Sequence, residues 1–410
     1  TRNQARAWRP LGYIAHPRVK TRNRKRGREA AAQVCRNTHA QLDIILQSLW
    51  EAQQPDALQN FNLILGNQCK RVKLFVPIGP IIVDAQGGDE MACRVMCYNH
   101  YAKRICRTCD ASPEQCGNPD IPCRRVTMQE CIDAYFNQDE EAMQRLYIYN
   151  CRNAWFRMNF GNDPHGICSA LNTETLHAVK SGLIEHFLHD TFKNKFGAQF
   201  CRKIDAEVMH LASQPRHHGE NQFNRLRFPD GITDLTNVSS EDKHNILKTL
   251  LMALLTHSIG KRIVARFGGT AWDDLVQIVE VMLTFVAWTA KDTFWACDSA
   301  TGEATTAEAL KAMLRMLNEL APRQDGFAWN LSKIHEILHM ACDIGRNAAL
   351  ENTNSGPSEH NHISFAKNPA NTVRAERVLY DANVAERYVD HLILELAESR
   401  TARSPHHVNN

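Results

Sequence analysis

The stretch KLFVPIGPIIVDAQGGDEMACR, residues 73–94, opens as a continuous apolar run and ends in acid and glycine. An apolar run of this kind is typical of a central strand that is buried on both faces. We therefore predict a strand over 72–84. A carboxylate at the end of such a strand is costly unless it is solvated, paired or bound to a metal. Asp84 and Asp89 are accordingly the first candidate site residues.

Positive charge is concentrated at one end of the chain. The sequence has 410 residues, which allows two or three domains, and a formal net charge of only +3. Residues 1–28 nevertheless hold ten lysines or arginines and no acid. The run KTRNRKRGR, 20–28, is typical of a nuclear-import signal or a nucleic-acid contact, and a solvated basic tail is the alternative. The candidate nucleic-acid residues are Arg22, Arg24, Lys25 and Arg26.

The remaining bulk features favour a protein that does not enter a membrane. The first residues lack the apolar segment of a secretory signal. The most apolar long stretch, from Leu275, contains Gln277 and Glu280, so we expect a core helix there. The fourteen cysteines should then be mostly reduced thiols or metal ligands. Because the chain begins without Met, we expect a fragment or a processed product.

Six potential zinc ligands lie between residues 97 and 123, and they are Cys97, His100, Cys106, Cys109, Cys116 and Cys123. Cys106 and Cys109 form a CxxC pair, whose spacing lets both thiolates bind one ion. No second CxxC follows, and a set of buried free cysteines is the alternative interpretation. The preferred ligands of a structural zinc are His100, Cys106, Cys109 and Cys123, with Cys97 and Cys116 as substitutes.

A second metal-binding pattern occurs in IHEILHMACDIG, residues 334–345, which contains His335, Glu336 and His339. On a helix the two histidines share one face and Glu336 can act as a general base, as in zinc peptidases. Glu359, twenty residues beyond His339, is a conceivable third ligand. With 19 histidines in the chain, packed or surface histidines on an ordinary helix are the alternative. A zinc peptidase therefore remains a second hypothesis.

Most of the remaining sequence predicts helices. AQLDIILQSLWEAQ, 40–53, has helical apolar spacing, and 168–192 predicts an amphipathic helix capped by Asn172 or Thr173. Further helices are predicted between 240 and 320 and over 330–344. Strand signals cluster in the first third, so the sequence predicts a small α/β portion that carries a large helical part.

Five segments follow one another in a fixed order: TRNQARAWRPLGYI (1–14), FVPIGPIIVDAQGGD (75–89), the CxxC region (97–123), DPHGICSALNTETLHAVKSGLIEHFL (163–188) and KIHEILHMACDIGRNAALENTNSGPSEHNHISFAK (333–367). In this order they resemble the blocks of Plavaka-type transposases, which are relatives of the Kyakuja–Dileera–Zisupton elements. The resemblance runs from residue 1 to about residue 390. It offers a reason for the HExxH string that needs no peptidase.

The resemblance implies an α/β fold: a partial RNase H-like core with a cysteine-rich zinc insert and a large all-helical insertion. The expected segments are a basic arm (1–30), the partial core (31–95), the zinc insert (96–126), the helical insertion (127–330), C-terminal core helices (331–400) and a disordered tail (401–410).

The resemblance also implies a DDE transposase or a domesticated remnant of one. By position, Asp84 would be the second catalytic acid, with Asp89 as substitute, and Glu359 the third, with Glu351 as substitute. Such carboxylates hold two Mg²⁺ during DNA strand cleavage and transfer. The first aspartate would lie upstream of Thr1, so we expect the chain as given to be inactive.

The expected partner is DNA, in the nucleus, and self-association is a further expectation. Basic residues between Arg94 and Arg125 are expected to contact phosphates, as is the basic arm. A non-catalytic DNA-binding protein is the remaining alternative.

Overall fold

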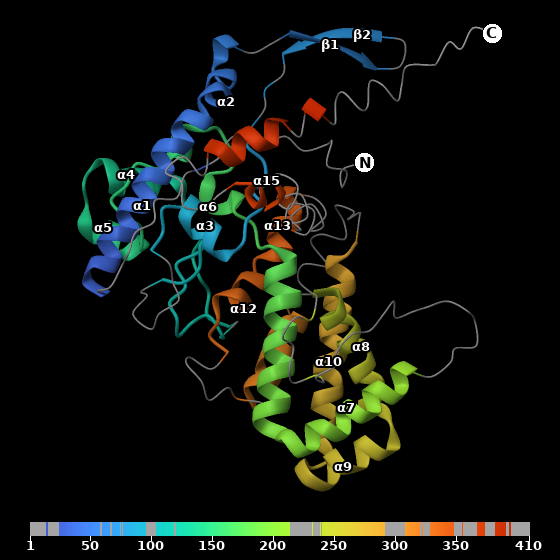
Figure 1. The fold of residues 1–410 in the computed structure, drawn as a ribbon. Coiled ribbons are helices and arrows are strands. Elements are labelled where there is room, and N and C mark those ends of the chain that lie inside the picture. The colour runs from blue at the N-terminus through green and yellow to red at the C-terminus, as the bar shows by residue number, and fades with distance from the viewer. Residues whose placement is uncertain are drawn as a thin grey trace, which may run out of the picture. The chain divides into compact units, whose positions relative to one another are not determined.

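The computed structural model divides into two compact units, one formed by Thr1–Val76 with Ser355–Asn410 and the other by Pro77–Asn354. Helices predominate, and the described residues contain a single two-stranded sheet (Figure 1). The structure describes residues 14, 24–57, 60–65, 68–73, 75, 77–95, 104–118, 120–213, 232, 238, 240–291, 308–319, 322, 329–347, 355, 367–373, 382–390 and 393–394.

The first unit contains helices and a β-hairpin. Helix α1 (Arg24–Ile45) is followed by α2 (Gln47–Ala52), so the helical prediction for 40–53 is confirmed. A 3₁₀ turn, η2 (Pro55–Ala57), precedes the antiparallel strands β1 (Asn60–Leu65) and β2 (Gln68–Lys73). The short α15 (Asn368–Asn371) and a helix over 382–390 belong to the same unit.

The apolar run that opened the sequence analysis is not a sheet strand. Strand β2 ends at Lys73, and residues 77–84 have no strand partner. Pro77 and Pro80 lack the N–H that a central strand must donate to its neighbour. The N–H groups of Ile78 and Ile81 donate instead to the carbonyls of Asn159 (2.8 Å) and Ala170 (2.7 Å). The prediction of a buried strand over 72–84 is therefore wrong, and an RNase H-like core is not confirmed.

The second unit begins with short helices around an irregular cysteine loop, residues 104–118. These helices are α3 (Ala85–Met91), α4 (Met128–Phe136), α5 (Glu140–Leu146), the 3₁₀ turn η3 (Ala154–Arg157) and α6 (Ile167–Ala170). A capping box starts α4, because Thr127 Oγ1 accepts from Glu130 N (3.2 Å) and the Glu130 carboxylate accepts from Thr127 N (2.8 Å). Glu130 also pairs with Arg124 at 2.8 Å, and this contact lowers the pKa of Glu130 to about 2.

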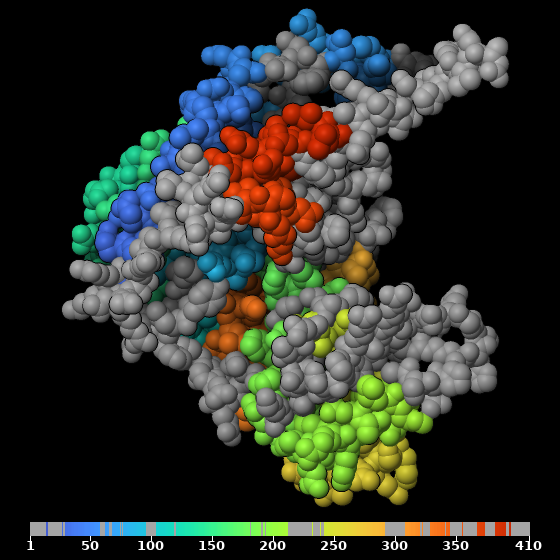
Figure 2. All heavy atoms as spheres, viewed as in Figure 1, coloured from blue at the N-terminus to red at the C-terminus, as the bar shows by residue number. Residues whose placement is uncertain are grey.

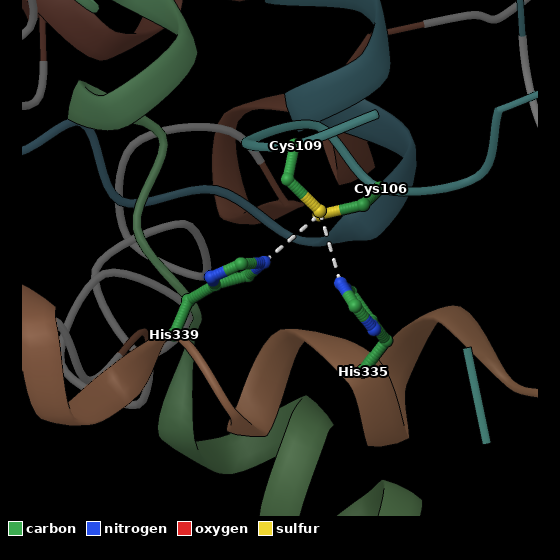
Figure 3. Close-up of side chains that lie close together, drawn as sticks. All are labelled: Cys106, Cys109, His335 and His339. Atoms are coloured by element: carbon green, nitrogen blue, oxygen red, sulfur yellow. Dashed lines mark hydrogen bonds between the residues drawn. The ribbon is translucent and has the colours of Figure 1, made fainter. Parts of the chain in front are cut away.

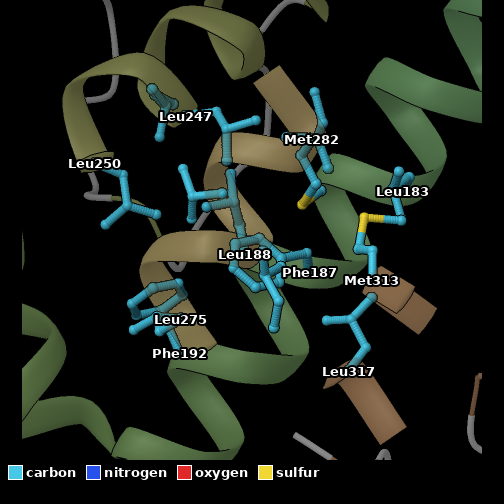
Figure 4. Packing of buried hydrophobic residues seen from close by; sticks show 14 of the residues in the cluster. Leu183, Phe187, Leu188, Phe192, Leu247, Leu250, Leu275, Met282, Met313 and Leu317 are labelled. Carbon is cyan, nitrogen blue, oxygen red and sulfur yellow. The ribbon is translucent and has the colours of Figure 1, made fainter. Parts of the chain in front are cut away.

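A helical bundle supplies the main core of the second unit. Its members are the π-helices η4 (Leu176–Ile184) and η5 (Phe187–Phe196), then α7 (Ala198–Ser213), α8 (Ser240–Leu255), α9 (His257–Phe267), α10 (Gly269–Thr289) and a helix over 308–319. Leu183, Phe187, Leu250, Met282 and Leu317 interdigitate between these helices and are almost fully buried (Figure 4). Each such side chain contributes about 1.5–3 kcal/mol by leaving water.

The apolar stretch from Leu275 lies in α10 and packs in this bundle, as expected for a core helix. Among the described helices, none combines the length and the apolar character that crossing a membrane requires.

The start of η4 differs from the predicted cap. Glu174, rather than Asn172 or Thr173, accepts the N–H groups of Leu176 (2.7 Å) and His177 (2.5 Å). The longer carboxylate reaches two donors at once, which neither predicted residue can do. Thr173 instead donates to a more distant helix, as described below.

Gly182 in η4 lies where α12 (Ser332–Ile337) packs on the bundle, and it leaves no room for a Cβ atom. A Cβ atom at this position would lie 2.7 Å from the His177 carbonyl and 3.1 Å from Lys333 Cδ. Glycine therefore avoids a clash with the backbone of η4 itself, and α12 packs on η4 beside it. α12 is followed by α13 (Met340–Asn347).

Replacing Thr127 by Ala should destabilise the second unit by about 1 kcal/mol, because a helix N-cap is lost.

Replacing Glu130 by Gln should destabilise the protein at neutral pH, since the folded pKa of Glu130 lies below its usual 4.5. That difference should be complete above about pH 4.5 and should shrink as the pH falls toward 2. Urea unfolding at several pH values measures both effects; a pH-independent difference for the Glu130 variant would contradict the ion pair.

Candidate metal centre

Four side chains from two distant segments meet in the second unit. Cys106 and Cys109 come from the cysteine loop, while His335 lies in α12 and His339 immediately precedes α13. Cys109 Sγ lies 3.0 Å from His335 Nε2, and Cys106 Sγ lies 3.3 Å from His339 Nε2 (Figure 3). One ligand atom from each side chain lies within 4.8 Å of the other three. Segments more than 220 residues apart thus converge on one point.

This Cys₂His₂ group can hold a metal ion such as zinc. Two thiolates and two imidazoles are a common donor set for tetrahedral zinc. Zn–S bonds of about 2.3 Å and Zn–N bonds of about 2.0–2.1 Å would separate sulfur from nitrogen by about 3.5 Å. The observed separations are a few tenths of an ångström shorter, so small side-chain rotations would admit an ion. Four protein ligands leave no open position, which is typical of a structural site.

The ionisation of the two thiols is strongly linked. Burial raises the pKa of Cys106, but the hydrogen bond from Cys109 and the nearby His339 outweigh it, so the pKa falls well below the usual thiol value. The hydrogen bond to Cys106, together with burial, raises the pKa of Cys109. Burial lowers the pKa of His339, yet the Cys106 thiolate and Asp343 more than offset this and raise it. A bound cation would favour both thiolates, because it supplies the missing positive charge.

Buried arginine holds the cysteine loop in shape. The guanidinium of Arg104 donates to the carbonyls of Cys109 (2.7 Å), Leu146 (2.9 Å) and Arg107 (2.6 Å). The backbone N–H of Thr108 points at Cys106 Sγ (3.3 Å), which favours the thiolate. The Arg104 side chain therefore holds both the carbonyl of the ligand Cys109 and the turn between Cys106 and Cys109.

A second buried ion pair ties the cysteine loop to α12. Arg107 pairs with Glu336 at 3.1 Å, and both side chains are at most 8% exposed. Arg107 also donates to the carbonyl of Ala85 (3.0 Å), the first residue of α3. Burial raises the pKa of Glu336, and the adjacent Arg107 counters that shift by favouring the carboxylate. The loop, α3 and α12 are thus joined through one guanidinium.

Two further hydrogen bonds position α12 beside the loop. Thr173 Oγ1 donates to the carbonyl of Glu336 at 2.9 Å. Gly117 N donates to Asn330 Oδ1 at 2.5 Å, just before α12 begins. A Cβ atom at Gly117 would lie 2.7 Å from that same oxygen, so glycine is needed for the approach. Hydrogen bonds from Thr173 and from Gly117 therefore hold α12 and the residue before it beside the cysteine loop.

The observed ligand group differs from the set predicted from the sequence. Cys106 and Cys109 are members, but Cys123 is half-buried and its thiol donates to the Ile121 carbonyl at 3.6 Å. Cys116 is buried within the cysteine loop, and Cys97 and His100 lie outside the described residues. His335 and His339 take the remaining places. The sequence did contain a signal for this set: Cys106 and Cys109 form a CxxC pair, His335 and His339 form an HxxxH pair, and each pair supplies two of the four ligands that a zinc site needs.

The predicted catalytic acids have ordinary structural partners where the structure describes them. Asp84 is exposed and caps α3, its Oδ1 accepting from Gly87 N at 2.6 Å. Asp89 is buried and pairs with Arg94 at 3.1 Å. Glu351 and Glu359 lie outside the described residues, so whether either carboxylate approaches Asp84 stays a prediction.

The predicted phosphate contacts near the cysteine loop are partly wrong. Arg94, Arg104 and Arg107 are buried and bonded within the protein, which removes them from any nucleic-acid surface. Of the basic arm, Arg24, Lys25 and Arg26 form the first turn of α1, whereas Arg22 lies outside the described residues.

Comparison with known proteins adds no identification: no protein-family model matches the chain, and no curated protein matches it significantly. The chemistry of the centre therefore has to be argued from its own geometry.

The purified chain should contain one zinc per molecule, bound by the four converging residues. Replacing Cys106 or His335 by Ala should abolish that zinc, whereas replacing Cys123 by Ser should leave it in place. Metal analysis gives the stoichiometry, and the absorption of a cobalt-substituted sample reports tetrahedral thiolate ligation without relying on stability. Loss of zinc in the Cys123 variant, with retention in the His335 variant, would contradict the assigned ligands.

Breaking the Arg107–Glu336 pair should be strongly destabilising. Arg107→Met and Glu336→Gln should each lower the free energy of unfolding by about 3–5 kcal/mol, because either leaves a buried polar group without its partner. The double variant should lose less than the sum of the two. Arg124→Met and Glu130→Gln form the matched surface control, and their coupling should stay below about 1 kcal/mol. Equal coupling in both pairs would contradict the buried link.

Proposed function

We propose that this chain is part of a DDE transposase, or of a domesticated descendant, in which the Cys₂His₂ centre acts as a structural zinc clamp. The observation that carries the proposal is the position of that centre along the chain. Cys106 follows Asp84 by 22 residues, since 106 − 84 = 22, and Glu359 follows His339 by 20, since 359 − 339 = 20. A clamp at this point ties the neighbourhood of one proposed acid to the segment that leads to the other.

The clamp also explains how a long helical insertion can be tolerated. Closing a loop of more than 220 residues costs conformational entropy, although this cost grows only slowly with loop length. A metal held by both ends supplies that closure directly, and the Arg107–Glu336 pair adds a second fixed contact. The helical bundle then lies between the two acids in sequence without separating the cysteine loop from α12.

Asp84 is suited to binding a divalent cation. Only Oδ1 is used in capping α3, and the exposed side chain leaves Oδ2 available. Asp89 is unsuited, because its carboxylate already neutralises the buried Arg94. In the intact enzyme Asp84 and Glu359 would hold Mg²⁺. When bound, that ion stabilises the negative charge on the attacking and leaving oxygens of DNA strand transfer. A nuclear location and self-association are parts of the same proposal.

The zinc-peptidase alternative is disfavoured by the same geometry. A catalytic zinc needs an open coordination position and a free general base. Here the Nε2 atoms of His335 and His339 each lie against a cysteine sulfur, and Glu336 is paired with Arg107. A DNA-binding protein that has lost catalysis would keep the clamp and lose only the acids' function.

The proposal predicts that Asp84 and Glu359 bind the same divalent cation. Zinc-loaded protein would be incubated with ferrous iron, ascorbate and peroxide, so that iron in a magnesium site cuts the nearby backbone. Cuts should appear around residue 84 and around residue 359. Magnesium should suppress both cuts by competition.

Matched variants decide the outcome. Asp84→Asn and Glu359→Gln should each remove both cuts, whereas Asp89→Asn and Glu351→Gln should remove neither. If each of the first two variants removes only its own cut, or if no cut appears at either acid, the carboxylates do not share an ion and the proposal is wrong.

A further inference from the structure

The two faces of the β-hairpin in the first unit differ in the polar and apolar residues that they carry. Its strands pair in a register that places Asn62 opposite Arg71 and Leu63 opposite Lys70. Directly opposed residues share a face of the sheet, and the face alternates along each strand. One face therefore carries Asn62, Arg71 and Lys73 together with Asn60, Ile64 and Cys69. The other carries Leu63, Lys70 and Val72 together with Phe61, Leu65 and Gln68.

The polar face of this hairpin is open to solvent. Asn62, Arg71 and Lys73 are all exposed. On the opposite face Leu63 and Lys70 are exposed as well, and Val72 is half-buried. The hairpin is drawn in blue in the space-filling view, where it forms part of the molecular surface (Figure 2). Neither strand contains an acid, so no charge within the hairpin neutralises its three cations.

A two-stranded sheet of this kind needs a partner to be well ordered. An isolated hairpin is marginally stable in water. Among the described elements, β1 and β2 pack chiefly against each other. Ile64, next to the turn, lies on the same face as Asn62 and is 73% exposed.

We propose that the face carrying Asn62, Arg71 and Lys73 binds duplex DNA in the major groove. That groove admits a two-stranded ribbon, and asparagine is suited to hydrogen bonding a base edge there. Arg71 and Lys73 lie two residues apart, about 6.8 Å along the strand, which matches the rise of two phosphates along one DNA strand. This contact extends the proposed function and does not depend on Asp84 or Glu359.

The geometry favours DNA over other polyanions. The major groove of double-stranded RNA is too deep and narrow for side chains to read. A vesicle surface or an acidic peptide offers negative charge without the regular spacing along a strand. These alternatives therefore become controls in the same experiment.

The test measures binding of the full zinc-loaded chain to a fluorescent 25-base-pair DNA duplex by anisotropy at several salt concentrations, without magnesium. The double variant Arg71→Gln/Lys73→Gln removes two phosphate contacts. Its slope of log K against log salt should become shallower by about 1.8, which raises Kd about 60-fold at 0.1 M salt. Omitting magnesium keeps the result independent of the proposed carboxylate site.

Two controls separate a local contact from a general charge effect. Lys261→Gln/Arg262→Gln removes two exposed cations from α9, and Lys70→Gln removes one from the opposite face of the hairpin. Both should change Kd by less than about threefold. The inference is overturned if the α9 variant loses as much affinity as the Arg71/Lys73 variant. It is also overturned if the wild-type chain prefers duplex RNA or anionic vesicles of phosphatidylserine, or fails to bind DNA.

Discussion

The arrangement of the second unit depends on one constraint: two thiols and two imidazoles from segments more than 220 residues apart must occupy the same small volume. Four polar side chains, three of them buried, do not gather in this way for packing alone, since unpaired thiols and imidazoles gain little from each other. A bound cation would provide the reason, because it would convert mutual repulsion between thiolates into shared ligation. The surrounding structure can then be understood as support for that ligation.

Buried arginines provide that support, and burying them costs desolvation free energy. Each guanidinium must have its donors satisfied and its charge compensated to lie inside a protein. Arg104 donates to three carbonyls, and Arg107 combines a carboxylate with a carbonyl, although its buried Nε has no hydrogen-bond partner. A planar fork with several donors suits this task better than lysine would. The basic character of the loop therefore stabilises the fold around the centre and is not available to a polyanion.

Local patterns in the sequence predicted local structure well and distant pairing poorly. The helices at 40–53 and around Leu275, and the metal-binding character of the CxxC pair, followed from spacing alone. The pairing of that CxxC with HxxxH did not, because closure over more than 220 residues leaves no periodic trace in the sequence. The strand over 72–84 was mispredicted for a reason that was visible: Pro77 and Pro80 remove donors that a central strand needs. Asp84 likewise sits where an N-cap belongs, with the α3 residues directly after it.

The central claim is that one zinc ion joins the cysteine loop to the histidine helix. X-ray absorption at the zinc edge of the purified chain measures its ligands most directly. The account predicts two sulfurs at about 2.3 Å and two nitrogens at about 2.0–2.1 Å. A shell of four sulfurs, or one that includes water or carboxylate oxygen, would contradict it.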